Sequence, residues 1–139
     1  MKMSSPKVKF GWKAGTEQYP PQELLDYAVV AEEAGFDSID ASDHFHPWSE
    51  RGQACFVWTW LGATAVKTTN IMLGTGVTCP ILRYHPAIIA QAAATLACLV
   101  PGRAFLGIGT VRRRSTNMRP QGCGQLTRPD RRKLSRPSI

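Results

Sequence analysis

The stretch from residue 71 to residue 109, IMLGTGVTCPILRYHPAIIAQAAATLACLVPGRAFLGIG, contains two short apolar segments on either side of a long alanine-rich one. Residues 71–75 and residues 104–109 are each short and apolar enough for a buried strand. Between them, residues 87–99 have the length of a helix, which Pro101 and Gly102 end. A strand, a helix and a second strand in this order predict one unit of a parallel α/β fold.

The same alternation of strand and helix precedes this stretch. Polar and apolar side chains alternate over residues 7–13, which predicts a first strand. Residues 22–34 place their apolar side chains on one helical face, residues 38–42 predict a second strand, and residues 56–66 predict a buried helix. About four βα units result, whereas a TIM (β/α)8 barrel needs roughly 250 residues. We therefore expect an α/β fold that forms the N-terminal half of such a barrel.

Charge divides the 139-residue chain into two parts. Residues 1–110 contain eight basic and nine acidic side chains (net −1), whereas residues 111–139 contain nine basic and one acidic (net +8). The second part has no aromatic side chain and too few apolar ones to offset the entropy lost on ordering. We expect a folded domain over residues 1–110 and a disordered or frame-shifted basic tail over residues 111–139.

Several classes of protein are disfavoured by the sequence. No apolar run reaches the roughly 18 residues of a membrane span. The four cysteines are too widely spaced to indicate a zinc site or a disulfide framework. The two glycine pairs, Gly74-x-Gly76 and Gly107-x-Gly109, are not the GxGxxG of a dinucleotide-binding fold. A cytoplasmic protein without a membrane anchor is expected.

Functional residues of parallel βα folds gather where the strands end. Asp43 and His44 follow the second predicted strand, and a neutral imidazole beside a carboxylate can accept a proton near pH 7. A turn with solvated histidines is the alternative. His44 and His46 could also be two ligands of a metal-dependent hydrolase, but only His85 remains as a further histidine. We therefore predict no metal site.

Several motifs taken together resemble one family. They are Glu17-Gln18, Ser42-Asp43-His44-Phe45-His46-Pro47-Trp48, Leu73-Gly74-Thr75-Gly76-Val77, Arg83-Tyr84-His85-Pro86-Ala87, Pro101-Gly102-Arg103 and Phe105-Leu106-Gly107-Ile108-Gly109-Thr110. The chain resembles the luciferase-like oxidoreductases, and among them the branch that uses coenzyme F420, a deazaflavin. The resemblance implies a (β/α)8 barrel, often a homodimer, that transfers a hydride between an alcohol or sugar-phosphate carbon and the deazaflavin. FMN is the alternative cofactor, and the substrate is a small molecule.

The resemblance also implies roles for individual residues. His44 matches the catalytic base, Trp48 matches an aromatic residue that stabilises the reacting groups, and Glu17 matches a carboxylate near the active site. The cofactor-binding positions are then Asp43, His44, Thr75, Gly76, Val77 and Thr110. Gly76 and Val77 match a strand bulge with a non-prolyl cis peptide that backs the cofactor ring.

The resemblance stops after Thr110. The family continues there with Gly-Glu-Ala-Leu-Asn-Glu, whose first Glu is its proposed proton donor, whereas this chain has Val111 and Arg112. Plausible codons for residues 113–122, read one base earlier, can encode Glu-Ala-Leu-Asn-Glu-His-Ala-Ala-Thr-Gly, as the family would have. We therefore hypothesise a frameshift after Thr110 and expect an inactive fragment. A tail that binds nucleic acid is the rival interpretation, which the lack of stacking aromatic residues disfavours.

Overall fold

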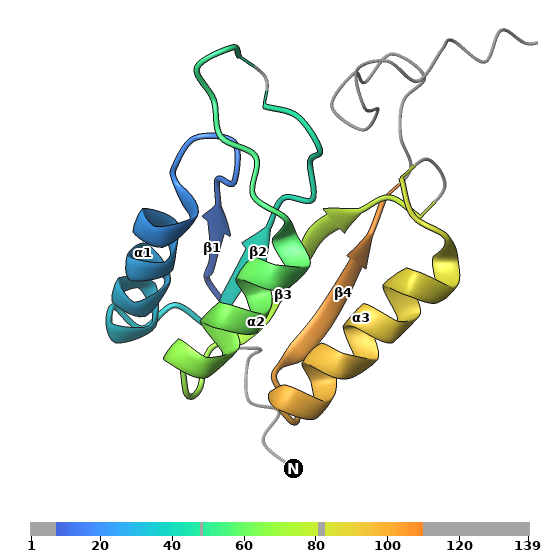
Figure 1. The fold of residues 1–139 in the computed structure, drawn as a ribbon. Helices are drawn as coiled ribbons and strands as arrows, with labels where there is room; N and C mark the ends of the chain where they lie inside the picture. Colours follow the sequence, from blue (N-terminus) through green and yellow to red (C-terminus); the bar gives the residue numbers. More distant parts are fainter. Residues whose placement is uncertain (1–7, 48, 81–82, 110–139) are drawn as a thin grey trace, which may run out of the picture.

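The computed structural model describes residues 8–47, 49–80 and 83–109. It contains a parallel sheet with the strand order β1-β2-β3-β4, and its helices lie on one side of that sheet (Figure 1). Along the chain the elements are β1 (Gly11–Ala14), α1 (Pro21–Glu33), β2 (Ser38–Ala41), α2 (Val57–Lys67), β3 (Met72–Thr78), α3 (Pro86–Leu99) and β4 (Ala104–Ile108). The predicted parallel α/β arrangement is confirmed.

Two strand boundaries differ from the prediction by more than one residue. β1 begins at Gly11 rather than residue 7, and the backbone N–H of Phe10 donates to the Asp37 carboxylate over 2.8 Å. β3 runs to Thr78 instead of ending at Thr75, and its register with β4 shifts between Thr75 and Thr78. The additional residues form a bulge, which a period-two pattern does not predict.

The core lies between the sheet and the helices. Ile39 on β2 and Leu73 on β3 are fully buried there against Leu24, Ala28 and Leu61 from α1 and α2. Burying side chains of this size stabilises a fold by about 1.5–3 kcal/mol each. Among the described residues, no helix is long and apolar enough to cross a membrane.

A single carboxylate holds the turn that leads into β3. Glu32, near the end of α1, accepts hydrogen bonds from the backbone N–H groups of Thr69 (3.0 Å), Asn70 (2.6 Å) and Ile71 (2.8 Å). Partial burial acts to raise the pKa of Glu32, but these three hydrogen bonds and the charge of Arg103 outweigh it and lower the pKa. The turn therefore depends on the ionised carboxylate.

Replacing Glu32 with glutamine is expected to destabilise the fold by about 1–1.5 kcal/mol, because charge-assisted hydrogen bonds become neutral ones. Since the folded-state pKa is lowered, the stabilisation from Glu32 is fully present above its ordinary pKa of 4.5. It is lost as the pH falls through the lower folded-state value. Urea unfolding at pH 7 and at pH 3.5 measures both effects, and an equal loss at the two pH values would contradict this account.

Candidate functional site

Because the strands are parallel, the carboxyl ends of β2, β3 and β4 lie at the same end of the sheet (Figure 1). β2 ends at Ala41, so Asp43 and His44 already belong to the loop that follows it. Gly76 and Val77 lie near the end of β3, and Gly107 and Gly109 lie at the end of β4. The structure thus brings three of the predicted segments together at the carboxyl end of the sheet.

His44 contacts a carboxylate from the loop after β1. Its Nδ1 lies against Oε1 of Glu17, whose side chain is buried. Two hydrogen bonds join the loops that hold this pair: Thr16 Oγ1 donates to the carbonyl of Ser42 (2.9 Å), and the N–H of Gln53 donates to the carbonyl of Glu17 (2.9 Å). Glu17 is therefore a carboxylate that orients the His44 imidazole.

The environment of His44 favours the neutral imidazole. Burial lowers the pKa of His44, and the nearby charges of Lys13 and Arg83 lower it further. The Glu17 carboxylate acts in the opposite direction because it favours a protonated ring. With its pKa below the ordinary value of 6.5, His44 is mostly neutral at pH 7 and can accept a proton.

Asp43 is fully buried and has three hydrogen-bond donors. They are Thr78 Oγ1 at 2.9 Å, Arg83 Nη1 at 2.9 Å and Tyr84 Oη at 3.1 Å. Thr78 comes from β3, whereas Arg83 and Tyr84 come from the loop before α3. The Asp43 carboxylate therefore joins the ends of β2 and β3 to the start of α3.

Sequence reasoning did not connect these three donors with Asp43. Each is separated from Asp43 by 35 to 41 residues. The only signal in the sequence was their position, since Thr78 ends a strand and Arg83 and Tyr84 precede a helix. Burial raises the pKa of Tyr84, and the charge of Asp43 raises it further, so the phenol remains a donor.

The bulge of β3 presents an open surface beside this network. Gly76 and Val77 are joined by a cis peptide bond, as the resemblance implied. Lys13 Nζ contacts the carbonyl of Gly76 and lies 3.0 Å from Oδ2 of Asp40. A Cβ on Gly76 would meet the Asp40 carboxylate, so a side chain has no room there.

Val77 gives this surface its apolar character. The Val77 side chain is 47% exposed, and it occupies the space that a Cβ on Gly109 would need. Thr75, by contrast, is fully buried, and its Oγ1 donates to the carbonyl of Gly107 over 3.1 Å. Val77 is therefore the exposed apolar side chain at the bulge, whereas Thr75 is buried between β3 and β4.

Two predicted site residues, Trp48 and Thr110, lie outside the described residues. His46 was considered with His44 as one of two possible metal ligands. Its Nδ1 lies 2.7 Å from the carbonyl oxygen of Pro47. Within the three described ranges, no group of three or more His, Cys, Asp or Glu side chains could hold a metal ion.

The chain is similar to a set of known enzymes. The model of the luciferase-like monooxygenase family matches residues 6–132. The F420-dependent glucose-6-phosphate dehydrogenase of Mycolicibacterium smegmatis is 53% identical over 105 residues, which are 75% of this chain and 31% of the relative. The protein of the same name from Kineococcus radiotolerans is 56% identical over 104 residues, or 74% of this chain and 31% of the relative.

Two solved structures have the same arrangement of strands and helices. An F420-dependent secondary alcohol dehydrogenase in complex with an F420-acetone adduct is 44% identical, with a TM-score of 0.72 over 75% of this chain and 32% of that one. The coenzyme F420 dependent tetrahydromethanopterin reductase of Methanopyrus kandleri is 33% identical, with a TM-score of 0.64 over 77% and 28%. The chain spans about a third of the length of the curated relatives.

Proposed function

The chain belongs to the luciferase-like monooxygenase family, and from this premise we propose that its residues form part of a site for hydride transfer between a small alcohol or sugar phosphate and coenzyme F420, in a chain that is by itself an inactive fragment. The predicted family and the partial (β/α)8 barrel are both confirmed by the comparisons. The proposal rests on one observation: a His44 imidazole held by Glu17 lies at the same strand edge as the Gly76–Val77 bulge.

The residues of the site fit a deazaflavin ring. A flat ring needs a surface without protruding side chains; the strand ends pack too closely at Gly76, Gly107 and Gly109 for any side chain there, and Val77 is the exposed apolar side chain among them. When bound, the deazaflavin supplies the carbon that accepts the hydride. Lys13 lies beside the bulge and places a positive charge near this surface.

His44 has the properties of a general base for an alcohol. We propose that the Nδ1–H of His44 donates to Glu17 and that Nε2 is the ring nitrogen that accepts the hydroxyl proton of the substrate. Glu17 then stabilises the imidazolium that forms. Because burial lowers the pKa of His44, the base is available at neutral pH. A base of this kind contributes about 10²–10⁴-fold to rate.

A fluorescence titration with coenzyme F420 tests the proposed site. We expect saturable binding with Kd roughly 100 μM, which corresponds to about −5.5 kcal/mol. Val77→Asp should abolish it, because the substitution places a charge against an apolar ring. Val66→Asp is the matched control, since Val66 is 82% exposed on α2, away from the strand ends. Absence of saturation, or equal binding by Val77→Asp, would refute the proposed function.

We also propose that the reading frame changes after Thr110. The support is the codon argument and the loss of the family motif at Val111 and Arg112. The family match itself continues to residue 132, so the deciding measurement is the DNA sequence of this region. A shifted frame that continues the barrel sequence would support the proposal, and its absence would rule the proposal out.

A further inference from the structure

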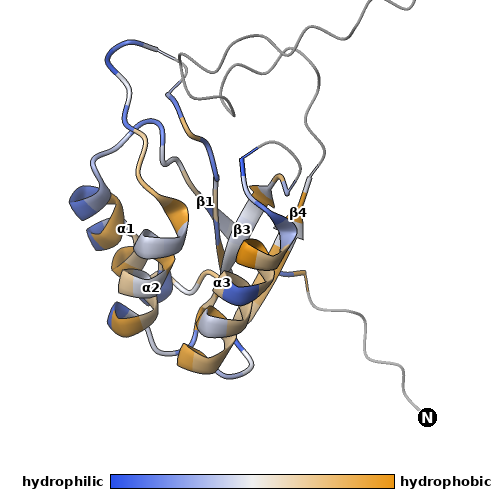
Figure 2. Cartoon of the chain, turned by 45° about the vertical axis from the view of Figure 1, so that its right-hand side comes forward, coloured by the Kyte–Doolittle hydropathy of each residue, from blue (hydrophilic) through white to orange (hydrophobic). Residues whose placement is uncertain are grey.

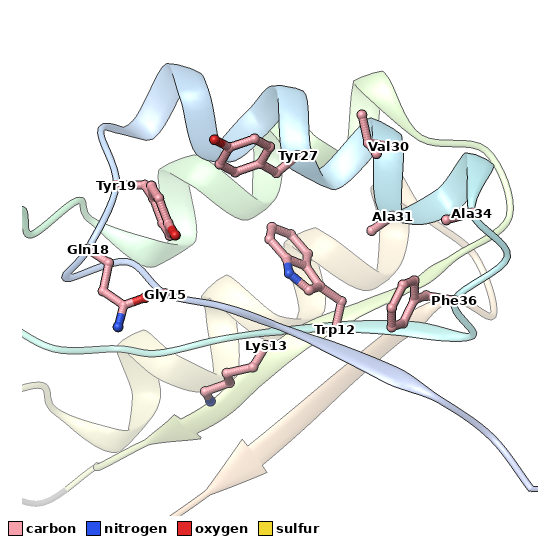
Figure 3. A pocket seen from close by; sticks show the side chains of 10 residues that line it. All are labelled: Trp12, Lys13, Gly15, Gln18, Tyr19, Tyr27, Val30, Ala31, Ala34 and Phe36. Carbon is pink, nitrogen blue, oxygen red and sulfur yellow. The ribbon is translucent and has the colours of Figure 1, made fainter.

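Lys13 and Asp40 form an ion pair to which the proposed mechanism gives no step. Lys13 on β1 and Asp40 on β2 are register partners, so their side chains leave the sheet on the same face. Lys13 points away from α1, whereas the ring of Trp12, its neighbour on β1, points toward α1 (Figure 3). The helices cover the opposite face, and α3 among them is mostly hydrophobic or neutral in colour (Figure 2). The ion pair therefore lies on the face of the sheet away from the apolar core.

The bulge of β3 leaves one backbone carbonyl without a strand partner. The register of β3 with β2 ends at Thr75, and its register with β4 resumes only at Thr78. Within the described ranges, Gly76 and Val77 therefore have no register partner on either side. The Lys13 ammonium contacts the carbonyl of Gly76 and lies 3.0 Å from Oδ2 of Asp40. At the bulge, the ammonium thus takes the place of a hydrogen bond between strands.

The value of the ion pair lies in its position. The side chains of Lys13 and Asp40 are 48% and 34% exposed, and ion pairs exposed to this degree contribute little to stability. Asp40 also limits where the bulge can lie, because a Cβ on Gly76 would meet its carboxylate. The Gly76 backbone is therefore held by Lys13 through its carbonyl and lies closely against Asp40.

We propose that Lys13 is a positioning residue, which holds the Gly76 carbonyl and so fixes the bulge of β3, and that Asp40 keeps Lys13 in place. The functional side of this inference rests on the proposed function, because Val77, the exposed apolar side chain at the bulge, directly follows Gly76. Without the ammonium, Gly76 and Val77 are free to adopt other backbone arrangements. The surface for the coenzyme is then present in only a fraction of the molecules, and the observed affinity falls by that fraction.

The same ammonium acts on the proposed base. Burial lowers the pKa of His44 most, and the charge of Lys13 lowers it further, so the ammonium lies within electrostatic range of the imidazole. Lys13 is therefore connected with both parts of the proposed site, the base and the bulge. Since its charge alone affects the base, a test of the proposal needs a signal from the bulge itself.

The bulge can be observed selectively, because Gly76–Val77 is the only Gly-Val pair in the sequence. A chain labelled with ¹³C-carbonyl glycine and ¹⁵N-valine gives one carbonyl–amide correlation by NMR. In Lys13→Met, the Gly76 carbonyl signal should move upfield, because a hydrogen bond from a cation is lost. Lys13→Arg keeps a cationic donor and should move the signal less. Lys67→Met, at an exposed side chain at the end of α2, is the matched control that should leave it unchanged.

Fluorescence titration of the same variants with coenzyme F420 measures the consequence for binding. We expect the Kd of Lys13→Met to be about tenfold above that of the wild type, as for the loss of one charge-assisted hydrogen bond. Asp40→Asn keeps the size of the side chain but releases Lys13, and should raise the Kd roughly threefold. Lys67→Met should leave the Kd unchanged.

Two results would overturn the proposal. One is a Gly76 carbonyl signal unchanged in Lys13→Met, with circular dichroism showing the variant to be folded. The other is a moved signal with unchanged coenzyme affinity. If Lys13→Met does not fold, Asp40→Asn decides in the same way. A wild-type chain that does not bind the coenzyme would refute the proposed function, and the carbonyl signal would still decide whether Lys13 holds the bulge.

Discussion

Arg83→Met is expected to reduce the free energy of unfolding by about 3–5 kcal/mol. Arg83 donates to the fully buried carboxylate of Asp43 over 2.9 Å, and its own side chain is only 11% exposed. Methionine keeps the apolar stem but removes the charge, so Asp43 is left with two neutral donors, Thr78 and Tyr84. An uncompensated buried carboxylate is far more costly than a lost surface ion pair.

Aromatic rings add to this effect. The Arg83 guanidinium lies 4.7 Å from the ring centre of Tyr84, 5.3 Å from that of Phe45 and 5.6 Å from that of Phe56. Each such contact stabilises a cation by about 0.5–1 kcal/mol at exposed sites and by more when it is desolvated. These aromatic contacts help to hold the guanidinium in place, in addition to its ion pair with Asp43.

Urea unfolding followed by tryptophan fluorescence measures the loss. Arg51→Met is the matched control, because Arg51 is an exposed loop residue, and it should change the stability by less than about 0.5 kcal/mol. Asp43→Asn combined with Arg83→Met should recover part of the loss, because the amide needs no cation. A loss below about 1 kcal/mol for Arg83→Met would show that Thr78 and Tyr84 alone satisfy Asp43.

The order of the elements could be predicted from the sequence because it depends on local patterns. Pro101 and Gly102 follow the helix before β4, as predicted, and Gly35, with φ of 84°, is the left-handed residue that follows α1. The length of β3 could not be predicted in this way. Residues 76–78 belong to the strand because they pair with β4, about 30 residues later, and a local pattern does not contain that pairing.

The site was predicted in part. Asp43 and His44 were identified from their position after a strand, but the pattern suggested that Asp43 orients the imidazole, whereas the structure places the Glu17 carboxylate on that ring. Glu17 and the cis peptide at Gly76–Val77 were expected only from the family resemblance. The donors to Asp43 were missed because they approach from β3 and from the start of α3, so only the folded chain brings them together.

Gly107→Ala is expected to destabilise the fold by about 3 kcal/mol, at the upper end of the range for overpacking. A Cβ at this position would meet the backbone carbonyl oxygen of Thr75 and would lie 3.4 Å from Cγ1 of Val77. A backbone oxygen in a paired strand cannot rotate away as the end of a side chain can. β3 and β4 must therefore separate at the bulge, and the hydrogen bond from Thr75 Oγ1 to the Gly107 carbonyl is lost.

Gly62→Ala is the control for this prediction, and it is expected to raise the stability of the fold instead of lowering it. Gly62 lies within α2, and a Cβ there would meet nothing within 4 Å. Alanine should stabilise the helix by about 1 kcal/mol, since glycine is the poorer helix former. The two Gly→Ala variants should therefore differ by about 4 kcal/mol in urea unfolding. If Gly107→Ala left the free energy of unfolding unchanged, β3 and β4 would not approach each other as closely as the structure shows. The surface proposed to hold the coenzyme ring would then not require a glycine at position 107.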